Sequence, residues 1–269
     1  MSYLHARVEK MQFTDDAHIV RHEGLRRLLL LKPMKKHPVL IENVELKVAE
    51  SEVVALVGAS GAGKTTLLRI MAGLESRFAG HVSLDSQPVT KPSRKIQVVF
   101  QDNRLLPWFN VRRNIAFAAE DLEKADRVEH VNKWVKKVGL DSRAKAIPKN
   151  LSGGEESRVA FARVFIEPPK ALLLDEPFRA LDAMTKYGLQ AELLEFIAEN
   201  GTTVVFVSHS IDDAVLLSDR VIVLKRDPLA IHQEFVVSQT RPRGREDAGL
   251  VSVSTQVYQA LNEANARTF

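Results

Sequence analysis

Residues 53–66 read Val-Val-Ala-Leu-Val-Gly-Ala-Ser-Gly-Ala-Gly-Lys-Thr-Thr, and this stretch decides the fold class. The five apolar residues at 53–57 are typical of a strand buried on both faces of a parallel sheet. Positions 58–65 fit the pattern G-x-x-x-x-G-K-[ST], and a helical pattern over 67–72 follows. Strand, glycine loop and helix in this order favour a phosphate-binding loop over a glycine turn with an incidental lysine.

Each part of this loop has a physical role in holding phosphate. Glycines let the backbone fold closely, so that several N–H groups converge on one anion, and the helix start adds a favourable dipole. Lys64 is predicted to reach the β- and γ-phosphates, and the Thr65 hydroxyl to coordinate Mg²⁺. The predicted nucleotide-binding residues of the loop are Gly58, Ala59, Ser60, Gly61, Ala62, Gly63, Lys64, Thr65 and Thr66.

The rest of the chain alternates strand and helix patterns. Short apolar runs predict strands at 39–41, 44–48, 96–100, 171–174, 204–207 and 221–224. An amphipathic helix is predicted at 185–198. Strands that alternate with helices indicate an α/β fold. The expected organisation is a poorly packed basic leader (1–37), an α/β domain (38–225) with a helical subdomain at about 103–166, and a small C-terminal appendix (226–269).

Two adjacent carboxylates end another predicted strand. Residues 172–176 read Leu-Leu-Leu-Asp-Glu, and the carboxyl ends of parallel strands open onto the ligand crevice. Asp175 is predicted to bind Mg²⁺, directly or through water. Glu176, one residue further, is a candidate to polarise an attacking water. A solvated acidic turn is the alternative, which a phosphate loop in the same chain disfavours.

Composition and charge restrict the remaining functions. The 269 residues include no cysteine, so disulfides are excluded, and aliphatic runs such as 28–31 and 53–57 are far too short to cross a bilayer. These features favour an intracellular protein. The net charge of +4 lies wholly in residues 1–37, which hold eight Lys or Arg and four Asp or Glu, whereas residues 38–269 hold 30 of each. A neutral body argues against nucleic-acid binding.

A third pattern lies between the glycine loop and the acidic pair. Residues 151–155 read Leu-Ser-Gly-Gly-Glu, which at a helix start can bind an anion or merely cap the helix. With this loop 24 residues before Asp175, the chain resembles the ATP-binding subunits of ABC transporters over about 38–225. The loop matches the family's signature, except that Glu155 stands where glutamine is common.

The resemblance implies a P-loop NTPase core of the ABC ATPase type, with an inserted helical subdomain and an antiparallel β element near the N-terminus. It identifies Gln101 as the Q-loop glutamine, Asp182 as the D-loop aspartate and His209 as the switch histidine that contacts the γ-phosphate. The catalytic residues are then Glu176, His209 and Lys64. The implied Mg²⁺ ligands are Thr65, Gln101 and Asp175. The signature residues that act on the ATP of a partner subunit are Ser152, Gly153, Gly154 and Glu155.

The family's mechanism implies partners. Two ATP-binding subunits dimerise head to tail, and each ATP lies between one subunit's phosphate loop and the other's signature loop. Hydrolysis opens the dimer, and a separate integral membrane permease follows that motion. A solute-binding protein takes part indirectly, and the ATPase lies peripherally on the cytoplasmic face of the cell membrane.

Two stretches indicate a subfamily. Residues 100–108, Phe-Gln-Asp-Asn-Arg-Leu-Leu-Pro-Trp, and 241–243, Arg-Pro-Arg, resemble importers of nitrate, aliphatic sulfonates and taurine. Residues 105–108 are expected either to grip the permease or to anchor the helical subdomain.

The sequence also departs from the family pattern. No aromatic residue lies near Lys35, where an adenine platform is usual, so Lys35 or His37 is expected to hold the base, or the basic leader to rest near anionic lipid. Arg179 stands where a small residue is common, and is expected to alter the dimer interface or pair with an acid. These departures leave open a degenerate subunit that binds ATP with little turnover. A soluble ABC ATPase of DNA repair or translation is disfavoured, because the chain has no coiled-coil insertion or second cassette.

Overall fold

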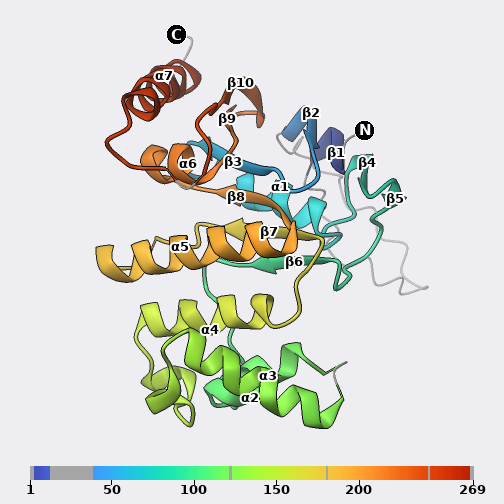
Figure 1. Ribbon diagram of the computed structural model, residues 1–269. Helices are drawn as coiled ribbons and strands as arrows, with labels where there is room; N and C mark the ends of the chain where they lie inside the picture. Colours follow the sequence, from blue (N-terminus) through green and yellow to red (C-terminus); the bar gives the residue numbers. More distant parts are fainter. Residues whose placement is uncertain (1–2, 13–38, 121–122, 180, 242, 267–269) are drawn as a thin grey trace, which may run out of the picture.

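The computed structural model describes residues 3–12, 39–120, 123–179, 181–241 and 243–266, which form two β-sheets with surrounding helices (Figure 1). The strands are β1 (Leu4–Gln12), β2 (Val39–Val48), β3 (Val53–Gly58), β4 (Ala79–Leu84), β5 (Gln87–Pro88), β6 (Ile96–Val99), β7 (Ala171–Asp175), β8 (Thr203–Val207), β9 (Arg220–Lys225) and β10 (Ala230–Val236). The α-helices are α1 (Lys64–Met71), α2 (Val111–Ala118), α3 (Lys124–Lys137), α4 (Gly153–Phe165), α5 (Ala183–Asn200), α6 (Ile211–Leu217) and α7 (Ala248–Asn265).

The larger sheet brings the predicted functional segments to one edge. Its order is β10-β9-β3-β8-β7-β6, and the neighbouring pairs from β9 to β6 are parallel, whereas β10 is antiparallel to β9. β3, β7 and β8 are buried along their whole length. The glycine loop follows β3, the acidic pair ends β7 and His209 follows β8, so all three emerge at the carboxyl edge. The predicted α/β fold is confirmed.

The smaller sheet is antiparallel, with the order β2-β1-β4-β5, and confirms the β element expected near the N-terminus. β1 lies between β2 and β4. Leu4, Ala6 and Val8 are fully buried, because their two-residue alternation points them at the core. The expectation of a poorly packed leader is therefore wrong for residues 4–12. The remainder of the basic leader, with Lys35 and His37, lies outside the described residues.

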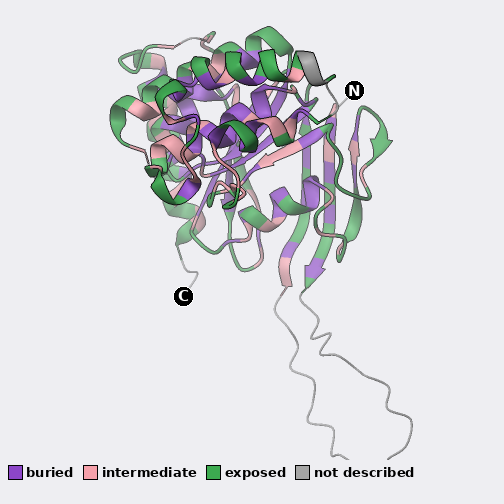
Figure 2. Ribbon diagram, turned by 90° about the horizontal axis from the view of Figure 1, so that it is seen from below, coloured by how far each residue is buried: buried purple, intermediate pink, exposed green. Residues whose placement is uncertain are grey.

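Two apolar cores cover the two faces of the larger sheet. On one face, α1 and the smaller sheet pack against β3, β7, β8 and β9. On the other face, helices α4 to α7 pack against the same strands. Figure 2 shows the buried strands enclosed by helices whose outer surfaces are exposed. No helix in the described ranges is long and apolar enough to span a membrane.

The helical stretch at about 103–166 has an apolar core of its own, whereas the C-terminal stretch packs into the core of the larger sheet. Helices α2, α3 and α4 share a third apolar core, which holds Val111, Ile115 and Val135. The C-terminal stretch is not an appendix: β10 extends the larger sheet, and α7 buries Leu250 and Val257 in the core that α4 to α6 share. The mostly polar face of β10 and the short apolar stripe of α7 hid this packing in the sequence.

Candidate active site

The glycine loop joins β3 to α1 through two left-handed residues. Gly61 has φ +75° and Gly63, which directly precedes α1, has φ +101°. A side chain at either position would strain the backbone, because L-residues rarely adopt positive φ. The glycines at these two positions of the motif therefore have a conformational reason, which is the tight path of the chain from strand to helix.

Lys64 lies inside this loop. Its Nζ donates hydrogen bonds to the carbonyl oxygens of Gly58 at 2.9 Å and Ala59 at 2.7 Å, and the side chain is buried. Burial lowers the pKa of Lys64, while the charges of Glu176 and Asp175 act in the opposite direction. The ammonium group is thus held at the carboxyl edge of the sheet, within reach of the charges of the two carboxylates at the end of β7.

Asp175 has one satisfied and one unsatisfied oxygen. Its Oδ2 accepts a hydrogen bond from Thr65 Oγ1 at 2.8 Å, whereas its buried Oδ1 has no partner among the described residues. Burial raises the pKa of Asp175, and the bond from Thr65 opposes that shift. With Gln101, these residues line a cavity of about 330 Å³. A free carboxylate oxygen beside a hydroxyl and an amide oxygen is a donor set that fits Mg²⁺.

Replacing Asp175 with asparagine is expected to stabilise the protein in Mg²⁺-free buffer. The raised pKa means that the charged carboxylate opposes folding above its folded-state pKa, and that this cost is absent below the unfolded-state pKa. Asparagine keeps the shape of the side chain and an acceptor for Thr65 but removes the buried charge, so Asp175→Asn should raise the melting temperature at pH 7 by about 2–4 °C. Circular dichroism melts measure this shift.

The gain should shrink as the pH falls, because the wild-type carboxyl, whose pKa is raised by burial, then takes up a proton and loses its charge. Asp212→Asn removes an exposed acid and serves as the control, with little change expected. A lower melting temperature for Asp175→Asn at pH 7 would contradict the burial argument.

Glu176 lines a second cavity, of about 540 Å³, together with Ser60. Its backbone has φ +51°, and its N–H donates to the carbonyl of Val207 at the end of β8 at 3.1 Å. Its Oε1 lies 2.5 Å from His209 Nε2, and its Oε2 lies 3.0 Å from Arg179 Nη1. The adjacency of β7 and β8 therefore brings Glu176 and His209 together. Arg179 pairs with an acid, which is one of its two expected roles.

The Leu-Ser-Gly-Gly-Glu loop forms the start of α4. Ser152 Oγ accepts a hydrogen bond from the Glu155 N–H at 3.2 Å, and Glu155 Oε2 accepts one from the Ser152 N–H at 2.8 Å, which is a capping box. The Arg143 guanidinium lies 3.1 Å from Glu155. The bond from the Ser152 backbone, together with Arg143, lowers the pKa of Glu155. A carboxylate therefore suits this position, because it has both a backbone and a cationic partner.

The signature residues do not join the rest of the predicted site within one chain. Ser152, Gly153, Gly154 and Glu155 line neither of the two cavities beside the glycine loop. Asp182 caps α5 by accepting from the Thr185 N–H at 3.0 Å, and this bonding lowers its pKa. An added Cβ on Gly154 would meet the Thr185 methyl at 3.2 Å. The signature loop therefore lies beside the start of α5, which Asp182 caps, and not beside the cavities at the glycine loop.

Sequence reasoning missed a buried ion pair behind Glu176. Asp213, in the first turn of α6, lies 2.5 Å from Lys186 Nζ and accepts a hydrogen bond from Gln190 Nε2 at 3.0 Å. Lys186 and Asp213 also line the Glu176 cavity. The four-residue spacing of Lys186 and Gln190 on one helix face was the available signal. This cluster ties α5, which begins after Asp182, to the helix that follows His209.

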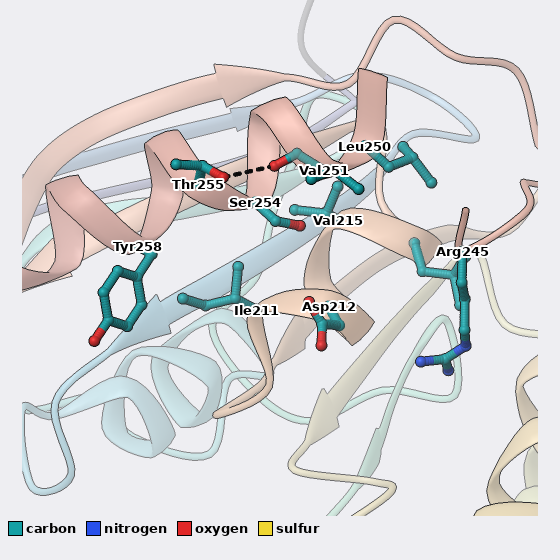
Figure 3. A pocket seen from close by; sticks show the side chains of 10 residues that line it. Ile211, Asp212, Val215, Arg245, Leu250, Val251, Ser254, Thr255 and Tyr258 are labelled. Carbon is teal, nitrogen blue, oxygen red and sulfur yellow. Dashed lines mark hydrogen bonds between the residues drawn. The ribbon is translucent and has the colours of Figure 1, made fainter. Parts of the chain in front are cut away.

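A separate groove of about 470 Å³ lies between α6 and α7. Figure 3 shows Ile211 and Val215 on α6 facing α7, whose Tyr258 lies at one end of the groove, with Arg245 at the other end. None of the predicted site residues lines it.

The stretch at 105–108 is divided between anchoring and exposure. Leu105 packs against both the sheet core and the helical core. Buried Asn114 holds the turn, because its Oδ1 accepts from the Leu106 N–H at 2.8 Å. Trp108, in contrast, is 70% exposed, and Phe117 is also exposed. The structure therefore shows an apolar anchor at the first residue and a free aromatic surface at the last.

The chain is similar to a family of transport proteins and to individual relatives whose names state an import role. A family model described as ABC transporter matches residues 41–179. The aliphatic sulfonates import ATP-binding protein SsuB 1 of Xanthomonas axonopodis pv. citri is 47% identical over 228 residues, which are 83% of this chain and 90% of that protein. The nitrate import ATP-binding protein NrtC of Synechocystis sp. is 43% identical over 228 residues, 83% of this chain and 33% of that protein.

A solved structure shares the fold. The dimeric post-hydrolysis state of the ATP-binding cassette MJ0796, bound to ADP and Pi, matches with a TM-score of 0.73 and 25% identity, over 88% of this chain and 100% of that chain. Together with the strand-edge arrangement of the glycine loop, Asp175, Glu176 and His209, these similarities identify the family. The chain belongs to the ABC transporter family, as an ATP-binding subunit that hydrolyses ATP.

Proposed function

We propose that this chain hydrolyses MgATP to energise the import of a small oxyanion through a separate membrane permease. The oxyanion is either nitrate or a sulfonate such as taurine. The observation that carries the ATPase chemistry is the assembly of Lys64, Asp175, Glu176 and His209 at the carboxyl edge of three neighbouring strands. The import role and the solute class are supported by the similarity to sulfonate and nitrate import subunits.

Each side chain then has a task. Lys64 and the loop N–H groups hold the β- and γ-phosphates, and His209 contacts the γ-phosphate. Thr65, Asp175 and Gln101 would hold Mg²⁺, which supplies positive charge to the phosphate oxygens. Glu176 orients a water and takes its proton as the water oxygen bonds to the γ-phosphorus, while the bond from that phosphorus to the β-phosphate oxygen breaks.

A second copy of an ATP-binding subunit completes this site. Because Ser152, Gly153 and Gly154 line neither of the two cavities beside the glycine loop of their own chain, they are available to the γ-phosphate of a head-to-tail partner. The similarity to dimeric cassettes supports this arrangement. The exposed Trp108 suits contact with the permease on the cytoplasmic face of the membrane, and a solute-binding protein would deliver the solute from the other side.

Deleting the gene in its source organism is expected to abolish growth on an alkanesulfonate as the only sulfur source, or on nitrate as the only nitrogen source. Growth on sulfate and ammonium is the internal control. Wild-type protein should restore growth, and Lys64→Ala should not, because the loop then lacks the cation that binds the phosphates. Unchanged growth on both oxyanions would contradict the proposed import role.

A further inference from the structure

The Glu176 carboxylate has a side-chain nitrogen close to each oxygen. His209 Nε2 lies 2.5 Å from Oε1, and Arg179 Nη1 lies 3.0 Å from Oε2. Glu176 is 11% exposed, whereas the Arg179 side chain is 61% exposed, so the guanidinium reaches inward from the surface. The backbone supports this pose, because the Arg179 N–H donates to the Glu176 carbonyl at 3.2 Å.

We infer that Arg179 is a positioning residue that restrains Glu176 and thereby slows hydrolysis in the isolated subunit. This inference rests on the proposed role of Glu176 as the group that takes the proton of the attacking water. An interaction that is stronger in the ground state than in the transition state raises the barrier. As Glu176 takes the proton, its negative charge falls, and its attraction to Arg179 weakens at the moment of reaction.

The same pair also fixes where the carboxylate points. A water that attacks phosphorus needs a carboxylate oxygen as its hydrogen-bond acceptor, and each oxygen here already has a side-chain nitrogen within hydrogen-bonding distance. The Arg179 bond is the weaker restraint, because exposed ion pairs contribute little. Its loss should therefore change the rate by a small factor, about two- to fivefold.

Arg179→Ser tests this restraint. We expect kcat for MgATP hydrolysis to rise about two- to fivefold, with KM within about twofold of the wild-type value. Arg179→Lys keeps the charge and should return kcat most of the way to the wild-type rate. Arg7→Ser, which removes an arginine paired with Glu9 on the smaller sheet, is the matched control and should leave kcat unchanged. Arg179→Gln is a second neutral variant should the serine protein fail to fold.

A double variant separates this inference from the proposed function. If Arg179 acts through Glu176, Glu176→Gln with Arg179→Ser should hydrolyse ATP as slowly as Glu176→Gln alone. A rate increase in that background, or a kcat for Arg179→Ser at or below wild type, overturns the restraint and leaves the role of Glu176 intact. A wild-type rate equal to that of Glu176→Gln overturns the role of Glu176, and the restraint with it.

Discussion

Replacing Glu176 with glutamine is expected to lower kcat for ATP hydrolysis by about 10²- to 10⁴-fold, while MgATP still binds. Glutamine has the shape of glutamate and keeps one carbonyl oxygen near His209, but it takes no proton from water. The side chain is nearly buried beside the cavity, so the substitution changes chemistry with little change in packing. Phosphate release at saturating MgATP measures kcat, and calorimetry measures binding.

Glu199→Gln, which removes an exposed acid near the end of α5, is the matched control, and its kcat should equal that of wild type. Excess EDTA should stop hydrolysis by the wild-type protein if Thr65, Gln101 and Asp175 hold Mg²⁺. Equal rates for Glu176→Gln and wild type would refute general-base action by Glu176. If both were at background, the chain would be the degenerate subunit that its missing aromatic platform left open.

Replacing Arg243 with methionine is expected to destabilise the fold by about 3 kcal/mol or more, which lowers the melting temperature by about 6 °C or more. Its side chain is 1% exposed, and its guanidinium donates to five backbone carbonyls. Those of Val215, Leu216 and Ser218 lie at the end of α6, where helix carbonyls lack partners within the helix. Methionine fills space and leaves these acceptors without donors.

Urea denaturation measures this loss. Arg241→Met is the matched control, because the Arg241 guanidinium pairs with the partly exposed Asp219, and its removal should cost about 1 kcal/mol or less. Burial lowers the pKa of Arg243, but the shift starts from so high a value that the guanidinium stays charged. Equal losses for the two variants would show that the five carbonyl contacts add nothing beyond the ion pair of Arg241 with Asp219.

The sequence predicted the carboxyl-edge cluster because its members follow apolar runs. Runs of this kind mark parallel strands, and parallel strands end at one edge. The order of the strands in the sheet was not predictable from the sequence. The contact between Glu176 and His209 was not predictable either, because it depends on the pairing of β7 with β8. Arg179 was expected to alter the dimer interface or to meet an acid, but its spacing alone did not name Glu176.

The predictions for the N-terminal leader and the C-terminal stretch were wrong because the average charge or polarity of each segment outweighed a local strand pattern. The alternation of Leu4, Ala6 and Val8 was present in the sequence, but the charge of residues 1–37 as a whole suggested a solvated leader. In β10, the polar residues 232–234 hid a strand that pairs with β9. The proposed role of the signature loop requires a second molecule, and the packing of a single chain does not include that contact.

The central place of β1 has a consequence for how the chain acquires its structure. β1 pairs with β2 on one side and with β4, which begins at Ala79, on the other. During synthesis its apolar face therefore waits for the emergence of strands far along the chain, a non-local arrangement that slows folding. Throughout that interval Leu4, Ala6 and Val8 lack the neighbours that bury them in the folded protein. A truncation of residues 1–27, made to probe the basic leader, would also remove this strand. An informative variant must keep β1 and delete only residues that follow Gln12.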